Sequence, residues 1–496
     1  MRELFELPLP QIKDIQVKRR NIDNPDISML KSQQKDAFDD LMRFVQGDEF
    51  MAWLITAPAG SGKTYLVGKF VESYLSARKT AKIAVAAPTN KAVKVLYRQA
   101  DYYHPNIDYV TVHKLLGLKE MTVENKQIFI QDWKNPPTID EYDLVIIDEV
   151  SMLGTDLLNG VAEDNKRNRR PMKGLLNYMQ EGVKMIFVGD KYQIPPVNSD
   201  DCPLFNKFVR QRHHIGYSEM TEIVRQAADN PIIQLATELR MDIKRGIKLR
   251  DRKDAYWEED KGTYFINRAD PVHKKYFYDL MAHLFPSQNF TYDADFAKVI
   301  AYRNDVVHKA NRNIRRLLFG VHELRRIEPG EKLIALDPIT EGENIIMPTN
   351  EEMEVEDFEP RDEVINDGQF TIPFYLTKVK YWRFDNSVQY KYIKVLGYKG
   401  QRMYDHILDL LAKHAQSFTK GSVPSKMAWG QYWEFKKQFA NVGYNYGITG
   451  HRSQGSTYDN AVVMANDILN NHDHTTANRI LYTSFTRPRH RLFIVY

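Results

Sequence analysis

The sequence predicts an α/β protein built from two domains, each with a parallel sheet flanked by helices. Short apolar runs that are typical of buried strands alternate with segments of helical periodicity along the chain. Two of these strands end in residues suited to bind phosphate and metal. The strand–helix alternation restarts near residue 229 without a second phosphate-binding motif. The 496 residues also favour several domains over a single core.

Composition indicates an ordinary globular chain. Hydrophobic residues make up 43% and charged residues 27%, and the net charge of +4 is too small to imply a nucleic-acid partner by itself. The single cysteine, Cys202, excludes an internal disulfide and a cysteine zinc cluster, and we expect a free thiol. The chain shows neither a long apolar stretch nor an apolar signal core. We therefore expect a cytoplasmic protein.

The strongest motif is APAGSGKT at residues 57–64, which lies between a predicted strand and a predicted helix. A glycine-rich loop in this position turns backbone N–H groups toward phosphate oxygens, and the helix N-terminus adds partial positive charge. Lys63 is expected to reach the β- and γ-phosphates, and Thr64 to hold Mg²⁺. The nucleotide-binding residues predicted here are Ala59, Gly60, Ser61, Gly62, Lys63 and Thr64.

The second motif follows the apolar run at residues 144–147. Asp148 is placed to hold Mg²⁺, and Glu149 to orient or deprotonate an attacking water. Adjacent acids after a strand are often plain turn residues, but their position after a phosphate loop favours catalysis.

Four further polar residues have chemistry suited to a bound nucleotide. The Gln34 amide can donate to and accept from adenine at once. Gln193 is a candidate sensor of the γ-phosphate, and Arg225 can reach the same phosphate. Arg487, at a predicted helix end, can enter the cleft from the second domain and stabilise charge on the leaving phosphoryl group.

Several segments have two interpretations that the residues alone leave open. Pro88, Thr89 and Asn90 follow a strand, and they either contact a ligand or cap the next helix. The segment with Thr111 and His113 is either a DNA-contacting loop or an ordinary helix start. Residues 117–141 contain a predicted hairpin, in which Phe129 either packs inside or, exposed at the hairpin tip, stacks on a base. Trp429 and Trp433 are packing anchors or stacking surfaces, and packing is favoured.

The remaining chain has a predictable organisation. We expect a lead-in over 1–28, a first domain over 29–228, a second over 229–330 and 441–496, and an inserted β-module with a projection over 331–440. A helix rich in Arg and Lys is predicted from Asn304 through Phe319. The charged loop 163–173 is either solvated or a phosphate contact.

Nine motifs in fixed order make the chain resemble superfamily 1B DNA helicases of the RecD-like group, and within it the Dda helicases of tailed bacteriophages. The motifs are LKSQQ, APAGSGKT, APTNKA, TVHKLL, VIIDEVSM, GDKYQIPPV, TEIVR, TGHRSQGST and LYTSFTRPR, from Leu30 nearly to the end of the chain. The chain departs from the family in the basic loop 163–173, in Asn90, and in the loops of 331–440.

The resemblance implies two RecA-like P-loop domains with ATP between them, a β-hairpin pin carrying Phe129, and an SH3-like β-module with a projecting tower. It implies that Gln34 and Gly455 belong to the nucleotide site, and that Gln193, Arg225 and Arg487 surround the γ-phosphate. Residues implied to contact single-stranded DNA, or to couple it to ATP, are Pro88, Thr89, Asn90, Thr111, His113, Phe129, Thr449, His451, Trp429 and Trp433.

The implied activity is ATP- and Mg²⁺-dependent 5′→3′ translocation on single-stranded DNA and unwinding of duplex DNA at junctions. The implied setting is a monomer in phage replication, recombination or repair, with a single-stranded DNA-binding protein as a partner. An RNA-directed or protein-displacing translocase is the nearest alternative. A phosphate-loop kinase or GTPase switch leaves the second half of the chain unexplained, and a binding protein that uses ATP only structurally leaves Glu149 unexplained.

Overall fold

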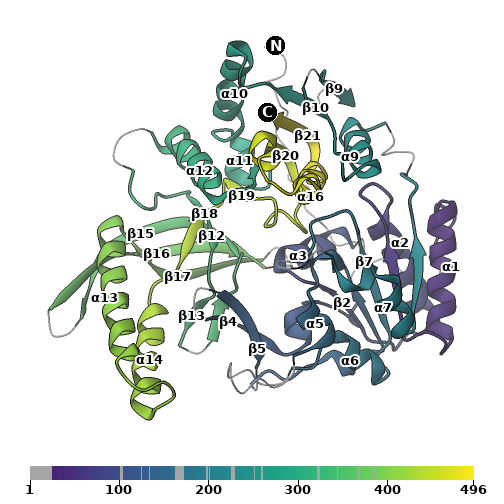
Figure 1. Ribbon diagram of the computed structural model, residues 1–496, viewed down its shortest axis with the longest axis horizontal. Helices are drawn as coiled ribbons and strands as arrows, with labels where there is room; N and C mark the ends of the chain where they lie inside the picture. The colour runs from purple at the N-terminus through teal and green to yellow at the C-terminus, as the bar shows by residue number, and fades with distance from the viewer. Residues whose placement is uncertain are drawn as a thin grey trace. The chain divides into compact units, whose positions relative to one another are not determined.

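The computed structural model describes residues 25–100, 104–123, 126–132, 134–161, 172–196, 199, 201–224, 229–250, 252–257, 261–320, 324–342, 344–365, 369–383 and 387–496, without the side chains of 120–128. The chain divides into two compact units (Figure 1). One unit is made of Met1–His308 and Gly447–Tyr496, and the other is Lys309–Tyr446. The second unit encloses the predicted insertion at 331–440.

The first sheet of the larger unit is parallel throughout and has the order β3-β2-β6-β7-β1-β8. Its strands are β1 (Ala52–Thr56), β2 (Ile83–Ala87), β3 (Ile107–Thr111), β6 (Leu144–Ile147), β7 (Met185–Gly189) and β8 (Ile215–Glu219). Its helices are α1 (Ser32–Gln46), α2 (Lys63–Ala77), α3 (Asn90–Gln99), α4 (Val112–Leu115), α5 (Thr155–Asn159), α6 (Leu175–Gln180) and α7 (Lys207–Arg212).

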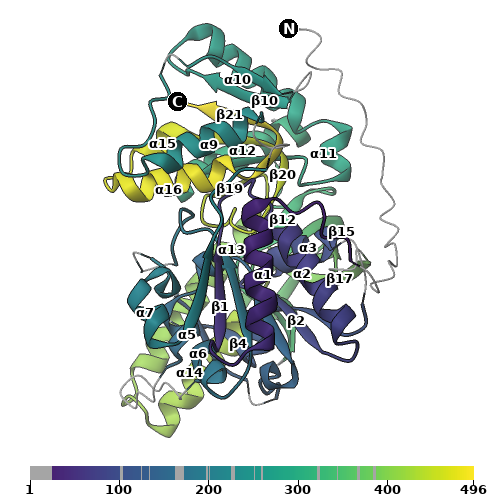
Figure 2. The same cartoon turned by 90° about the vertical axis from the view of Figure 1, so that its right-hand side faces the viewer.

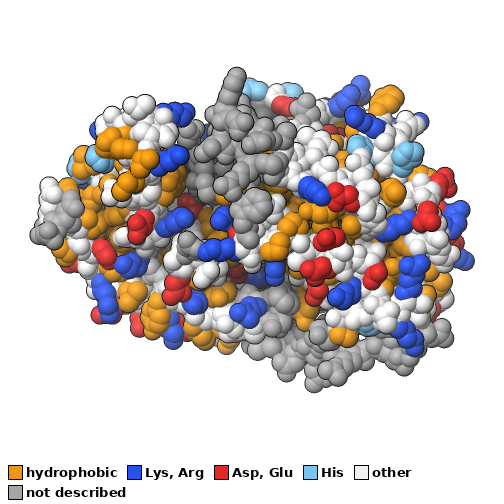
Figure 3. Space-filling view, turned by 90° about the horizontal axis from the view of Figure 1, so that it is seen from below, with side chains coloured by type: hydrophobic (Ala, Val, Ile, Leu, Met, Phe, Trp, Pro, Cys, Tyr) orange, Lys and Arg blue, Asp and Glu red, His pale blue; other side chains and the backbone are white. Residues whose placement is uncertain are grey.

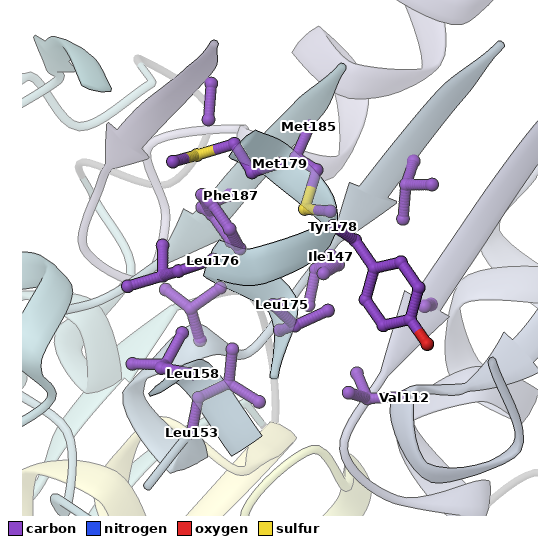
Figure 4. Packing of buried hydrophobic residues seen from close by; sticks show 14 of the residues in the cluster. Val112, Ile147, Leu153, Leu158, Leu175, Leu176, Tyr178, Met179, Met185 and Phe187 are labelled. Carbon is purple, nitrogen blue, oxygen red and sulfur yellow. The ribbon is translucent and has the colours of Figure 1, made fainter. Parts of the chain in front are cut away.

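Alternating side chains of these strands build a core on each face of the sheet. Leu54, Ile147 and Phe187 belong to the cluster that includes residues of α4, α5 and α6, part of which is drawn in Figure 4. Their neighbours Ile55 and Ile146 belong to the opposite cluster with α1 and α2, which lie along the near face in Figure 2. Burial on both faces explains why these strands are continuous apolar runs.

The second sheet has the order β19-β11-β20-β21-β10-β9 and is parallel except for the short edge strand β9. Its strands are β9 (Ala255–Trp257), β10 (Lys261–Ile266), β11 (Ala297–Ala301), β19 (Gly447–Thr449), β20 (Tyr458–Met464) and β21 (Pro488–Val495). Helices of this half are α9 (Pro231–Met241), α10 (Pro271–Leu284), α11 (Gln288–Tyr292), α15 (Ala465–Leu469) and α16 (His474–Phe485). The prediction of two parallel sheets flanked by helices is therefore confirmed.

The smaller unit is built on an antiparallel sheet of order β17-β16-β15-β12-β18. Its strands are β12 (Lys332–Ala335), β15 (Glu352–Ile365), β16 (Phe370–Trp382), β17 (Val388–Leu396) and β18 (Val442–Tyr444), with a separate pair β13 (Ile339–Glu341) and β14 (Asn344–Met347). Helices α13 (Tyr398–Gln416) and α14 (Val423–Lys436) follow, and α12 (Asn304–Phe319) has its predicted bounds across the border of the two units. The sequence predicts a β-module here, and the structure adds that its sheet is antiparallel. The SH3 likeness of the module stays a prediction.

A separate two-stranded hairpin, β4 (Leu118–Val123) and β5 (Lys126–Gln131), interrupts the first sheet domain at the predicted place. Cys202 is a free, buried thiol, as expected. Within the described ranges no helix combines the length and the apolar composition that a membrane crossing requires.

Candidate nucleotide site and strand-contacting segments

The phosphate loop joins β1 to α2, as the motif predicts. Gly60 and Gly62 have φ values of +81° and +75°, which only glycine adopts without strain. A Cβ on Gly62 would lie 2.3 Å from the Gln34 Nε2 atom, so the loop also needs the absence of a side chain. The Ser61 hydroxyl donates to the Pro58 carbonyl at 2.7 Å and closes the turn. A strand, a loop of this conformation and a helix N-terminus together form a nucleotide phosphate site.

Gln34 lies directly against this loop, 4% exposed. Its Nε2 donates to the Ser61 carbonyl at 3.0 Å, and its Oε1 accepts from the Lys31 amide at 3.0 Å. The Gln34 amide therefore links the start of α1 to the phosphate loop, and its adenine-reading role stays a prediction. The neighbouring Gln33 holds another segment, because its Oε1 accepts from the Thr221 and Glu222 amides at 2.6 and 3.0 Å.

The two acids follow β6 at the carboxyl edge of the first sheet. Burial raises the pKa of Asp148 to about 6, while the nearby Lys63 ammonium opposes the shift and Glu149 adds to it. A carboxylate that is short of countercharge beside a phosphate loop fits a divalent cation. Glu149 has a left-handed backbone with φ +55°, and its amide donates to Asp148 Oδ1 at 2.7 Å. Strained non-glycine residues of this kind concentrate at functional sites.

Gln193 connects Glu149 to Arg487, which come from different sheets of the larger unit. In the amide orientation that satisfies both ends, Gln193 donates to Glu149 Oε2 at 3.2 Å and accepts from Arg487 Nη2 at 3.3 Å. Arg487 is 5% exposed, and its Nε donates to the Thr483 carbonyl at 2.8 Å, which fixes the guanidinium at the end of α16. The structure thus brings together three predicted site residues that are far apart in sequence.

The same region holds two residues that the sequence interpretation missed, Tyr482 and Asp190. The Tyr482 hydroxyl donates to Asp190 Oδ2 at 2.5 Å and accepts from the Ala59 amide of the phosphate loop at 3.3 Å. Burial raises the pKa of Asp190, with Lys63 and Tyr482 opposing the shift. Both residues stand inside recognised motifs, LYTSFTRPR and GDKYQIPPV, and that membership was the signal available in the sequence.

Backbone contacts also join the two sheets of this unit. The Ile194 amide donates to Thr483 Oγ1 at 3.2 Å, and the Ile194 carbonyl accepts from Gln454 Nε2 at 2.8 Å. Gly455, with φ +68°, lies against α3, since a Cβ there would meet the Ala92 Cβ at 2.7 Å. This contact explains the glycine, and a nucleotide-binding role for Gly455 stays a prediction.

Arg225 lies outside the described residues, which stop at Val224 and resume at residue 229. The Val224 amide donates to the Gly60 carbonyl at 2.9 Å. The segment that leads to Arg225 therefore reaches the phosphate loop.

The strand-contacting candidates of the first domain follow two neighbouring strands, because Ala87 of β2 pairs with Thr111 of β3. Thr89 caps α3 by accepting from the Ala92 amide at 3.2 Å, and Thr111 caps α4 by accepting from the Lys114 amide at 3.2 Å. Both residues thus act as helix caps, and capping leaves a DNA contact untested. Pro88 and Asn90 flank the first cap.

Phe129 is not at the hairpin tip. It lies on β5 opposite Glu120, and its ring stacks on the His113 ring with centroids 3.7 Å apart and planes 23° apart. Phe129 is 38% exposed. Burial lowers the pKa of His113 to about 4, and a hydrogen bond to the Pro88 backbone opposes the shift. The structure therefore brings His113, Phe129 and Pro88 together.

The remaining candidates are placed as follows. Thr449 ends β19 and accepts from the Arg452 amide at 3.4 Å, and burial lowers the pKa of His451. Trp429 and Trp433 are half-buried on α14, and each makes an edge-on contact with Tyr432. The ring centroids lie 5.3 Å apart for Trp429 and 5.0 Å apart for Trp433. Half-burial leaves their packing and stacking roles both open.

Of the basic loop 163–173, residues 163–171 lie outside the described residues. On the face drawn in Figure 3, Lys and Arg are interspersed with Asp and Glu, in keeping with the small net charge.

Comparison with known proteins agrees with these motifs. A family model described as an AAA domain matches residues 29–258, and a UvrD-like helicase C-terminal domain matches residues 444–495. The ATP-dependent DNA helicase dda of Enterobacteria phage T4 is 25% identical over 93% of this chain and 98% of its own length. The ATP-dependent RecD2 DNA helicase of Deinococcus radiodurans is 32% identical over 37% of this chain and 21% of its length.

Among solved structures, the Pif1 helicase from Candida albicans aligns over 94% of both chains with 14% identity and a TM-score of 0.46. The sequence relatives bear out the predicted resemblance, which covers nearly the whole chain.

Proposed function

We propose that this chain, a superfamily 1B helicase of the RecD-like group, is an ATP-dependent DNA helicase that moves 5′→3′ on single-stranded DNA and opens duplex DNA. The observation that carries the proposal is the chain of contacts from Glu149 through Gln193 to Arg487. It joins a candidate catalytic carboxylate of one sheet to an arginine of the other. A phosphate group bound at Lys63 would touch both halves of the motor, so its arrival and loss can change how the halves meet.

Each residue has a specific part in this proposal. Lys63 and the loop amides bind the β- and γ-phosphates, and Thr64 with Asp148 would hold Mg²⁺, which supplies countercharge to the phosphates. Glu149 orients and deprotonates the attacking water. Gln193 senses the γ-phosphate, and Arg487, joined by Arg225, stabilises charge on the leaving phosphoryl group.

Movement on DNA needs grips that alternate. Pro88–Asn90 and Thr111 of the first domain, with Thr449 and His451 of the second, are the proposed grips on the single strand. The β4–β5 hairpin is the proposed pin that blocks the complementary strand, against a stacking energy of about 1.4 kcal/mol per base pair. Trp429 and Trp433, in the predicted tower, are proposed surfaces on which bases of the single strand stack.

The proposed setting is a cytoplasmic monomer that acts at junctions of single- and double-stranded DNA. A role in phage replication, recombination or repair, and a single-stranded DNA-binding protein as a partner, belong to the same proposal. The relative from phage T4 is the support for this setting.

Two partial duplexes test the function, one with a 5′ single-stranded tail and one with a 3′ tail, each with ATP and Mg²⁺. We expect strand separation from the 5′ tail alone. Separation from the 3′ tail alone would keep the motor and overturn its direction. ATP turnover without any separation would indicate a translocase that displaces proteins or acts on RNA.

A further inference from the structure

The β4–β5 hairpin is a structure that needs support. Within the described part of the chain, its two strands pair with each other and with no other strand. An isolated two-stranded hairpin is marginally stable in water. A pin that resists a DNA strand must therefore be fixed to the body of the protein by side chains.

Hydrogen bonds and apolar packing hold the base of the hairpin. The Asp132 amide donates to the Gly117 carbonyl at 2.7 Å, and Gln131 Nε2 donates to the same carbonyl at 2.9 Å. Leu118 is 8% exposed and belongs to the core of the first domain. These residues fix the base of the hairpin, where it joins the first domain. The direction in which the hairpin points depends on contacts farther along its strands.

Among the described side chains, the contact that reaches farthest along the hairpin is the stack of Phe129 on His113. Phe129 lies two pairs beyond the Leu118–Gln131 pair. Ring centroids 3.7 Å apart with planes 23° apart describe face-to-face overlap. The other partner of His113 is the Pro88 backbone, in the segment that follows β2.

His113 is held in place by its own helix. Thr111 caps α4, and Val112 and Leu115 on either side of His113 are fully buried in the core. The histidine ring is thus held in a fixed position at the carboxyl edge of the first sheet.

We propose that His113 is a positioning residue that holds the hairpin at a fixed angle to the segment Pro88–Asn90. This proposal rests on the proposed function, and it replaces the expected DNA contact of His113 with a supporting role. The Phe129 ring takes its position from His113, and His113 takes its own from Pro88. Movement of the strand-gripping segment is thereby passed to the hairpin. The low pKa of His113 agrees with this role, because a neutral ring keeps one N–H for the Pro88 carbonyl and can stack without a charge to solvate.

Two variants test the role, His113→Ala and His113→Phe. His113→Ala removes the platform under Phe129, whereas His113→Phe retains a ring of similar size. We expect His113→Ala to slow unwinding from the 5′ tail about two- to tenfold, the range for the loss of one ring stack. Translocation on single strands, followed by displacement of a dye at the strand end, should stay within about twofold of the wild type. His113→Phe should restore most of the unwinding rate.

A measurement independent of helicase activity separates this proposal from the proposed function. Hydrogen–deuterium exchange over residues 118–131 should be faster in His113→Ala than in the wild type, and close to the wild type in His113→Phe. Faster exchange in His113→Ala, together with a wild-type protein that opens neither duplex, would leave the positioning role in place and overturn the helicase function. Equal exchange and equal unwinding in all three proteins would overturn the positioning role, as would equal loss of translocation and unwinding.

Discussion

Two charge networks lie in different units of the molecule, and they differ in how many of their charged atoms have a hydrogen-bond partner inside the protein. In the larger unit, burial raises the pKa of Asp148 to about 6, and the Lys63 ammonium of the phosphate loop opposes this shift. Neither Lys63 Nζ nor Asp148 Oδ2 makes a side-chain hydrogen bond within the described residues. Both charged atoms can therefore still bind a ligand.

The network of the smaller unit is closed. Arg315 is 3% exposed and Glu331 is fully buried, and Arg315 donates to both Glu331 oxygens at 2.8–3.0 Å. Arg315 Nη2 also donates to the Arg325 carbonyl at 2.8 Å, and the Tyr446 hydroxyl donates to Glu331 Oε1 at 2.7 Å. Every charge here has its partner inside the protein.

The comparison teaches how to tell a working site from a structural one. Buried charges that complete each other have no interaction left for a ligand, and removing one of them leaves the other buried and uncompensated. Charged groups that lack hydrogen-bond partners inside the protein can still bind phosphate and metal. The first three predictions below test that distinction, and the fourth tests the neutral state of His113; they are given in order of decreasing expected effect at neutral pH.

The largest effect is expected for Lys63→Ala. Without the ammonium, the phosphates lose their main cationic contact, and DNA-stimulated ATP turnover should fall about 100-fold or more. Turnover is measured with and without single-stranded DNA, and the melting temperature serves as a control for folding. Normal turnover in this variant would falsify the site assignment.

Arg315→Leu should have the opposite profile. Removing one partner leaves Glu331 charged and buried, at a cost of about 3–5 kcal/mol in the stability of the smaller unit. We expect a lower melting temperature with ATP turnover per folded molecule unchanged. Arg316→Leu is the matched control, because Arg316 is exposed and next in sequence. If both variants melt alike, the closed network contributes little.

Tyr482→Phe removes one hydroxyl from the contact between the two sheets of the larger unit. Asp190 loses a buried donor, so stability should fall by about 1–3 kcal/mol, and ATP turnover should slow by less than in Lys63→Ala. Tyr192→Phe is the control, since the half-buried Tyr192 ring packs 6.3 Å from Tyr482 and its hydroxyl makes no hydrogen bond among the described residues. Equal effects of the two variants would contradict the bridging role of the Tyr482 hydroxyl.

At neutral pH the smallest effect is expected for His113, because its titration changes stability only below about pH 6.5. The pKa of His113 is lowered from 6.5 to about 4. Between these values the unfolded chain binds a proton that the folded chain does not, so stability is lost as pH falls from 6.5 to 4. The melting temperature of the wild type should therefore decline more steeply over this window than that of His113→Phe. Parallel curves would show that His113 is not kept neutral by the fold.

Most of the fold follows from the sequence, because its strands are short and buried. Runs such as Leu144–Ile147 are apolar at every position, which identifies central strands of a parallel sheet. The insertion was predicted less sharply. Its strand β15 runs over Glu352–Ile365 with many exposed polar positions, so periodicity alone does not show where it begins and ends.

The nucleotide site was also predictable to a large extent, since its residues come in contiguous motifs whose chemistry is local. Lys63, Asp148 and Glu149 lie where those motifs place them, at the carboxyl edge of the first sheet. Tyr482 and Asp190 were missed because their role depends on a contact between residues 292 positions apart.

By itself the sequence determined the residue types at each strand end, the order of the motifs and hence the chemistry available to the chain. The tertiary structure decided which of those residues meet. Gln193 lies between Glu149 and Arg487, and Phe129 lies on His113 instead of at the hairpin tip. The physical reason is that local patterns fix the backbone, whereas side-chain partners depend on how distant elements pack.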